Sequence, residues 1–289
     1  RALDPLTLEI TMKEGGYASL YALTFPIMEG GQPAATPVGT GPFMLESWSG
    51  EQARLVANEA WWKQRPYLDA ITFLERDSND TALASYRAGQ LDMVPSSNTS
   101  VGSYRDDNTI VLDIMTQTAE LLLINNTNAN LRDINVRKAF QHAIDKKAIA
   151  DGILNGSETI ADTLMAKTVP YCDVDLPVRS YDVVKANELM EKAGWSMGKD
   201  GYRYKAGKKC AVTIYYNSNN SQERTISEYM QNDLKKIGVE LKIVGEEKQA
   251  FLDRQRTGEF DLQYSLSWGT PYDPQSYLSS WRIPAHGDY

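Results

Sequence analysis

The second half of the chain alternates short runs of β-forming residues with amphipathic helical segments. CAVTIYY at 210–216 and VELKIV at 239–244 bracket a segment whose apolar residues recur at helical spacing before Gly238. A further helical segment, FLDRQRTGEF, precedes the strand-like run DLQYSLSW. Repeated strand–helix–strand order predicts an α/β fold with largely parallel strand pairing, in which ligands bind at the carboxyl ends of the strands.

The same alternation starts earlier, at ELLLIN, residues 120–125. A continuous apolar run of this kind is typical of a strand that is buried on both faces. It is followed by INVRKAFQHAIDKKAIADGIL, whose apolar residues recur with helical periodicity. This segment predicts one or two helices.

The first part of the chain is richer in strand signals. LTLEITM at 6–12 alternates like a half-buried strand, and GTGPFMLESW at 39–48 and ARLVAN at 53–58 predict two further strands. AITFLER at 70–76 predicts another. It runs into SNDTALASYRAGQLDMV, which has helix-capping residues at its start and predicts a helix followed by a strand.

The change from strand-rich to helix-rich sequence falls between Thr116 and Glu120. We therefore expect a first α/β lobe at 1–118 and a second α/β lobe at 119–289. Small-molecule pockets favour the interfaces between domains. Two α/β lobes with a cleft between them predict a small-molecule binder that closes about a hinge.

Charge and hydropathy exclude two classes of partner. The formal net charge is -8, and the longest basic groups are pairs such as Lys146-Lys147 and Lys208-Lys209. Nucleic acid is therefore not expected as a partner, because a surface that binds its backbone needs clustered Lys and Arg. Direct membrane insertion is not expected either, since no run approaches the roughly 18 apolar residues that cross a bilayer.

The two cysteines, Cys172 and Cys210, lack CxxC or histidine-spaced partners, which makes a structural zinc site improbable. Either one disulfide or two buried thiols fits their spacing. An enzyme is not expected, because the chain has no GxSxG, P-loop, GxGxxG after a strand or HExxH sequence. No cofactor is expected.

Aromatic residues crowd the segment WGTPYDPQSYLSSWRIPAHGDY at 268–289, which also holds His286, one of only two histidines. Trp268 is the last residue of the predicted strand DLQYSLSW, at the end where α/β sheets bind ligands. Trp268 and Tyr272 either fill a core or line a site. His142 lies inside an amphipathic helix and is expected to be a helix-surface or packing histidine, and Glu246-Glu247 is expected to form a solvated turn.

Several segments together resemble the peptide- and nickel-binding family of extracytoplasmic solute-binding proteins that serve ABC transporters. The resemblance rests on GTGPF at 39–43, NEAWWKQRPYLDAITF at 58–73, INNTNANLRDINVRKAFQHAID at 124–145, YDVVKANELMEKAGW at 181–195 and the segment at 268–289. The first four segments are common to peptide binders, whereas the last resembles members that bind nickel and metal chelates.

The resemblance implies a two-lobed, periplasmic-binding-protein type II-like fold that is truncated at both ends, with each lobe incomplete. It implies the substrate-binding component of an ABC importer, partnered by permease subunits and located in the periplasm or lipid-anchored outside the cytoplasmic membrane. The transported ligand would be a small-molecule chelate of Ni(II) or a related metal. His286 would contact the metal, and Trp268 and Tyr272 would line the ligand pocket.

One departure from the family bears on the ligand. Related nickel binders carry an arginine in the first lobe that grips the chelator's carboxylate, whereas the corresponding stretch here, YALTFPIMEGG, has Thr24 and no nearby arginine. Threonine cannot replace an arginine fork in bidentate carboxylate recognition. Either the carboxylate is held differently or the ligand differs, and a dipeptide- or oligopeptide-binding protein of the same family is the alternative.

Overall fold

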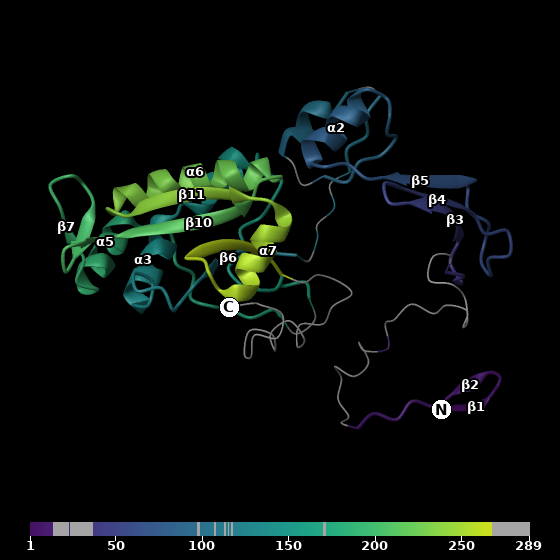
Figure 1. The fold of residues 1–289 in the computed structure, drawn as a ribbon, viewed down its shortest axis with the longest axis horizontal. Helices are drawn as coiled ribbons and strands as arrows, with labels where there is room; N and C mark the ends of the chain where they lie inside the picture. Colours follow the sequence, from purple (N-terminus) through teal and green to yellow (C-terminus); the bar gives the residue numbers. More distant parts are fainter. Residues whose placement is uncertain are drawn as a thin grey trace. The chain divides into compact units, whose positions relative to one another are not determined.

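A computed structural model describes residues 1–13, 23, 37–96, 99–106, 108–112, 114, 116, 118–169 and 172–267 of the chain. The chain divides into two compact units, Arg1–Asp77 and Ser78–Tyr289 (Figure 1). The boundary expected near residue 118 concerns the lobes of the family fold and stays a prediction. Within the described residues, no helix is long and apolar enough to cross a membrane.

The first unit contains two antiparallel sheets. Its strands are β1 (Ala2–Asp4), β2 (Thr7–Leu8), β3 (Phe43–Ser49), β4 (Gln52–Ala57) and β5 (Ala70–Leu74). Strands β1 and β2 pair with each other, and β3, β4 and β5 form a three-stranded sheet in chain order. The strand expected over residues 6–12 is thus confined to Thr7–Leu8, and its apolar side chains are exposed. The largely parallel pairing expected from the sequence does not extend to this unit.

The sheet of β3, β4 and β5 confirms the strands expected at 39–48, 53–58 and 70–76. Leu45 stands opposite Leu55, which in turn stands opposite Ile71. Residues directly opposite each other project from the same face of a sheet, so these three side chains share one apolar face. Arg54 donates from its Nε to Glu46 Oε2 across 2.6 Å and so joins β4 to β3.

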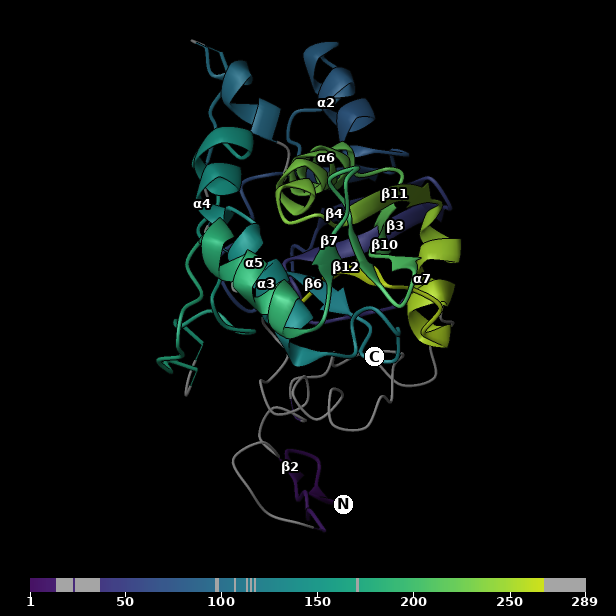
Figure 2. The same ribbon diagram turned by 90° about the vertical axis from the view of Figure 1, so that its left-hand side faces the viewer.

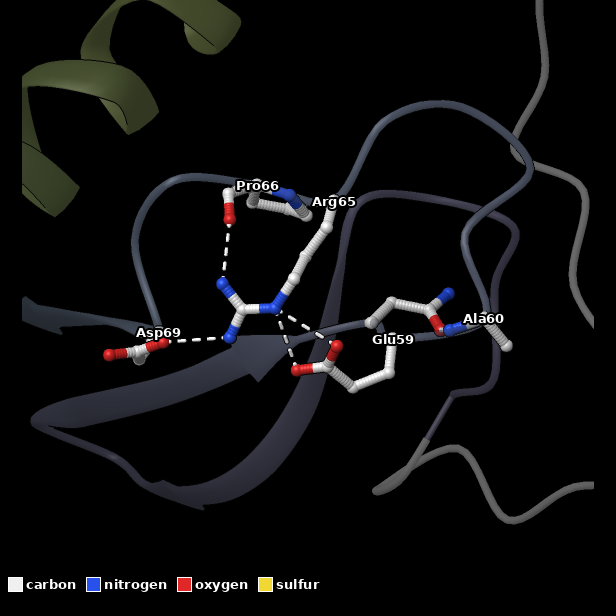
Figure 3. A network of polar contacts seen from close by, with 6 residues as sticks. Glu59, Ala60, Arg65, Pro66 and Asp69 are labelled. Carbon is white, nitrogen blue, oxygen red and sulfur yellow. Dashed lines mark hydrogen bonds and ion pairs between the residues drawn. The ribbon is translucent and has the colours of Figure 1, made fainter.

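Arg65 holds together the loop between β4 and β5 (Figure 3). Its Nε lies 2.9 Å from each carboxylate oxygen of Glu59, and its NH2 group donates to Asp69 Oδ1 across 2.7 Å. Its NH1 group donates to the carbonyl of Pro66. A planar guanidinium suits such a fork of acceptors better than an ammonium does. This part of the family-like segment 58–73 therefore has a structural explanation.

The second unit opens with α2 (Asn79–Arg87), as expected from the sequence. The Ser78 side chain caps the helix by accepting from the backbone N–H of Thr81 across 3.1 Å. The strand expected after this helix, in LDMV, is not formed. A 3-10 helix, η1 (Thr99–Tyr104), follows instead.

The second unit is built on a four-stranded sheet of order β11-β10-β12-β6 (Figure 1). The strands are β6 (Glu120–Ile124), β10 (Ala211–Asn217), β11 (Glu240–Glu246) and β12 (Leu262–Leu266). Strand β10 is parallel to both β11 and β12, whereas β6 runs antiparallel to β12. The expected α/β alternation is confirmed here, with β6 as the exception to parallel pairing.

Helices cover both faces of this sheet (Figure 2). The helical elements are α3 (Ile134–Ala143), α4 (Lys146–Ala148), η2 (Ile149–Ile153), α5 (Val183–Lys192), α6 (Ser221–Lys236) and α7 (Lys248–Thr257). The connections β10–α6–β11 and β11–α7–β12 step in opposite directions along the sheet. Because such crossovers are right-handed, they place α6 and α7 on opposite faces. The core lies mainly on the α6 side, where Val212 and Ile214 of β10 are buried.

A small antiparallel sheet of β7 (Ser196–Met197), β8 (Arg203–Lys205) and β9 (Lys208–Lys209) lies beside the end of α6. Arg203 is buried, and its guanidinium donates to the carbonyls of Ile237 and Trp195 and to Asn187 Oδ1, at 3.0, 2.6 and 2.8 Å. These bonds offset the cost of burying a charged group. They tie the small sheet to α5 and to the end of α6.

Candidate functional site

The residues expected to contact ligand lie outside the described residues. Trp268, Tyr272 and His286 belong to the segment 268–289, and Thr24 belongs to the segment 24–36. Their proposed roles stay predictions. The structure does describe Ser267, the residue that directly follows β12 and directly precedes the aromatic segment.

Two hydrogen bonds join Ser267 to Ala119, the residue that precedes β6. Its backbone N–H donates to the carbonyl of Ala119 across 2.8 Å, and its Oγ accepts from the Ala119 N–H across 2.7 Å. Both residues are buried. The aromatic segment therefore starts at the carboxyl end of β12, which is the edge where ligand binding is expected from the sequence.

Glu120, next to Ala119, brings a carboxyl group to the same edge. It stands opposite Leu266 on β12, at the first position of β6. Burial, and after it the negative charges of Glu223 and Glu158, raise the pKa of the Glu120 carboxyl to about 7. Sequence reasoning missed this residue, because both acidic neighbours come from distant parts of the chain.

The first turn of α6 supplies the second carboxyl group. Glu223 Oε2 accepts from the backbone N–H of Asn217, at the end of β10, across 3.1 Å. Its other oxygen accepts from Asn220 Nδ2 across 2.8 Å, and the Asn220 side chain caps the helix. Burial raises the pKa of Glu223, and these hydrogen bonds oppose the rise. The turn that follows β10 is thus tied to α6 through Glu223.

Tyr264 of β12 contacts the first turns of α6 through its hydroxyl. Its hydroxyl donates to the backbone carbonyl of Glu223 across 3.1 Å and lies 3.0 Å from Ser227 Oγ on α6. Burial is the main cause that raises the pKa of Tyr264, and the charges of Glu120 and Glu223 act in the same direction. This phenol therefore serves as a neutral donor.

The α7 face carries a different polar arrangement. The Arg254 Nε donates to Glu246 Oε2 across 2.8 Å, and its Cζ lies 4.1 Å from the centre of the Tyr215 ring. The expectation of a solvated turn at Glu246-Glu247 is therefore wrong for Glu246, which is ion-paired. Glu247 is exposed at the start of α7.

Two asparagines that follow β6, within the family-like segment 124–145, have a structural role. Asn125 is buried, and its Nδ2 donates to the carbonyls of Gly258 and Phe260, both at 2.8 Å. Asn130 Nδ2 donates to the carbonyl of Ala211 at the start of β10 across 2.8 Å. These amides lock the amino-terminal ends of the parallel strands, away from the carboxyl edge.

Neither His142 nor the cysteines form a metal centre in the described part of the chain. His142 lies in the last turn of α3, as expected, and its Nδ1 is 2.8 Å from the carbonyl of Ser180. Cys172 and Cys210 are buried free thiols, and burial raises the pKa of Cys210 to about 12. No group of three or more His, Cys, Asp or Glu side chains within the described residues is arranged to hold a metal ion.

A hollow of about 440 Å³ lies among α2, η1 and the residues around them. On its wall, the Arg87 Cζ lies 4.3 Å from the centre of the Tyr104 ring, and Asp92 and Asp106 also line it.

Comparison with known proteins places the chain among binding proteins. The model of the family described as bacterial extracellular solute-binding proteins, family 5 middle, matches residues 1–289. The nickel-binding periplasmic protein of Escherichia coli is 30% identical over 100% of this chain and 59% of its own length. The oligopeptide-binding protein AppA of Bacillus subtilis is 28% identical over 83% of this chain and 46% of its own length.

A solved structure is similar along most of the chain. The crystal structure of NikA from Brucella suis in complex with Fe(III)-EDTA has a TM-score of 0.79 and is 30% identical in sequence. The match covers 91% of this chain and 55% of the NikA chain. The expected periplasmic-binding-protein type II-like fold is confirmed by this similarity. The chain spans about half the length of the relatives that it matches.

Proposed function

Because the chain belongs to the bacterial extracellular solute-binding proteins of family 5, we propose that it captures nickel, or a related transition metal, as a small-molecule chelate for an ABC importer. Its relatives are solute-binding proteins and not enzymes. The metal complex is therefore a cargo, which the protein holds and releases unchanged, and no cofactor takes part.

The observation that carries this proposal is the similarity to the nickel-binding periplasmic protein of Escherichia coli, which extends over 100% of the chain at 30% identity. The similar protein from Brucella suis was crystallised in complex with a metal chelate, Fe(III)-EDTA. A chelate also suits this chain, since a single imidazole cannot satisfy a metal ion that prefers several nitrogen and oxygen donors.

In the proposed site, His286 supplies one neutral imidazole to the metal, while Trp268 and Tyr272 contact the flat or apolar edges of the chelator. The anchoring of Ser267 to Ala119 supports this role, because the segment that carries these residues leaves the sheet at its carboxyl edge. Thr24 replaces the arginine of related nickel binders, so the chelator's carboxylate would need another donor.

The proposed partners follow from the family. Permease subunits of an ABC importer would receive the loaded protein, and the protein would act in the periplasm or anchored by lipid outside the cytoplasmic membrane. The Escherichia coli relative is a periplasmic protein, which supports this location.

Peptide capture is the second candidate function, and the similarity to AppA favours it. A short peptide also presents a carboxylate and flat amide groups to an aromatic pocket. The two candidates differ in what they require of the ligand, because a chelate needs a metal and a peptide does not.

Isothermal titration calorimetry of the purified protein tests the proposal. The ligands are Ni(II)-EDTA, Ni(II) with L-histidine, the same chelators without metal, and a panel of di- to pentapeptides. We expect saturable binding of at least one nickel complex and weaker binding of the metal-free chelators. Tight binding of peptides in the absence of metal, with no binding of nickel complexes, would contradict the proposal.

A further inference from the structure

The hollow beside α2 is lined by two stretches of the second unit. One is the end of α2 with the residues after it, and the other is the end of η1 with the turn after it. Its volume of about 440 Å³ lies within the roughly 300–1,000 Å³ that is usual for small-molecule pockets. The lining includes Tyr86, Arg87, Asp92, Tyr104, Asp106 and Thr109.

Hydrogen bonds join the two sides of the hollow. The Tyr86 hydroxyl of α2 donates to Thr109 Oγ1 across 3.2 Å. The turn that carries Thr109 is closed by its own bonds, because the Thr109 N–H donates to the carbonyl of Asp106 across 3.3 Å and Asp106 Oδ1 accepts from the Asn108 N–H across 2.8 Å. The sides are therefore held together by the protein itself.

Arg87 brings a positive charge to the lining. Its Cζ lies 4.3 Å from the centre of the Tyr104 ring, and the centres of the Tyr86 and Tyr104 rings lie 6.4 Å apart. A cation–π contact uses the face of the ring and leaves the guanidinium without an oxygen acceptor. Among the described residues, none supplies such an acceptor to Arg87. Its N–H groups are therefore available to a carboxylate.

Asp92 and Asp106 bring two negative charges to the same lining. Both side chains are exposed, and neither forms an ion pair with any residue that the structure describes. Arg87 shares the lining with these two carboxyl groups and pairs with neither. One guanidinium and two carboxylates give the hollow a negative balance, which favours a ligand that carries positive charge.

We propose that the hollow binds a free amino acid with a basic side chain, whose carboxylate pairs with Arg87 and whose two cationic groups pair with Asp92 and Asp106. L-Lysine has this set of charges, with one carboxylate and two ammonium groups. The ring of Tyr104 offers an apolar surface to its methylene chain. The inference goes beyond the proposed capture of a metal chelate and does not depend on it.

Amide NMR of the nitrogen-15-labelled protein, titrated with L-lysine, tests the proposal. We expect saturable shifts of the Arg87, Tyr104 and Thr109 amides, and none at Val212 in the core of the sheet. Cadaverine has both amines of lysine but no carboxylate, so it should bind about fivefold more weakly, as for the loss of one exposed ion pair. L-Glutamate should bind more weakly than either, because it is an anion.

Two variants separate the roles of the charges. Arg87→Gln should weaken binding of L-lysine about fivefold and should not weaken binding of cadaverine, which has no carboxylate to lose a partner. Asp92→Asn should weaken binding of both ligands. Retained cadaverine binding shows that Arg87→Gln is folded. Arg224→Gln removes an arginine that is ion-paired with Glu228 on α6 and is the matched control, with unchanged affinity for both ligands.

Three results would overturn the proposal. The first is the absence of saturable shifts at the lining amides in the titration with L-lysine. The second is equal affinity for L-lysine, cadaverine and L-glutamate, since binding would then ignore the charges of the ligand. The third is the same affinity for L-lysine in Arg87→Gln as in the wild-type protein.

Discussion

Ser267 and Ala119 are joined by two backbone-directed hydrogen bonds, although 148 residues separate them in the chain. The pair links the end of β12 to the start of β6. It sits at the point where the described part of the sheet ends and the aromatic segment begins. Whatever the aromatic segment binds, the residue that precedes it is fixed to this buried edge.

Removing the Ser267 hydroxyl should destabilise the protein. In Ser267→Ala the buried N–H of Ala119 loses its acceptor, and an unsatisfied buried N–H costs about 1–3 kcal/mol. Urea denaturation followed by circular dichroism measures this loss. Ser265→Ala, on the same strand at a partly exposed position, is the control and should change the free energy of unfolding by less than about 0.5 kcal/mol.

The two neighbouring asparagines of the INNTN sequence should respond differently to alanine. Asn125 donates to two buried carbonyls, whereas Asn126 is exposed. We expect Asn125→Ala to lower the free energy of unfolding by about 2–4 kcal/mol, since two acceptors lose their donors. Asn126→Ala should be nearly neutral. Equal thermal shifts for the two variants would contradict a strand-locking role for Asn125.

Gly238 should tolerate no side chain. Its φ is +76°, and a Cβ built there would lie 2.7 Å from the Cγ of Arg203. Gly201 has a φ of +80° but no atom near the position of a Cβ. Gly201→Ala should therefore cost about 1–2 kcal/mol for the backbone alone, and Gly238→Ala about 2–5 kcal/mol once the contact with Arg203 is added. Similar melting temperatures for the two variants would contradict this difference.

Stability should fall as the pH rises from the ordinary pKa of a glutamate, 4.5, to about 7, and should change little above that. Because the pKa of Glu120 is raised from 4.5 to about 7 on folding, the unfolded chain releases this proton at a lower pH than the folded chain. The free energy of unfolding should drop by about 2–3 kcal/mol between pH 5 and pH 8 from this group. Glu120→Gln should flatten that part of the profile in urea denaturation. A profile of unchanged slope would assign the pH dependence to other groups.

Local periodicity predicts much of the sheet and its helices. Val212 and Ile214 alternate with half-buried residues on β10, and the apolar stripe of α6 ends at Gly238 as its sequence indicates. The antiparallel direction of β6 could not be predicted, because the continuous apolar run ELLLIN carries no signal for strand direction. LTLEITM predicts a longer strand than the structure contains, because alternation alone does not report whether a sheet face exists to bury it.

One feature of the candidate site could be predicted from the sequence, and another could not. Chain order predicts that the aromatic segment leaves a strand at its carboxyl end, and the contact between Ser267 and Ala119 agrees with that position. The acidic surroundings of Glu120 at the start of β6 could not be predicted. Glu120, Glu158 and Glu223 are remote in sequence, and only the fold brings their charges together.

The most direct test of the proposed function is the affinity for a nickel chelate of the wild-type protein, His286→Ala and His142→Ala, measured by calorimetry. His142 is the other histidine of the chain and contacts the Ser180 carbonyl from α3, so it controls for loss of an imidazole. We expect His286→Ala to weaken binding about tenfold or more, as for a lost bond to a charged partner, and His142→Ala to bind as the wild type does. Equal affinity of all three proteins for the nickel complex would contradict the assignment of His286 as the metal ligand.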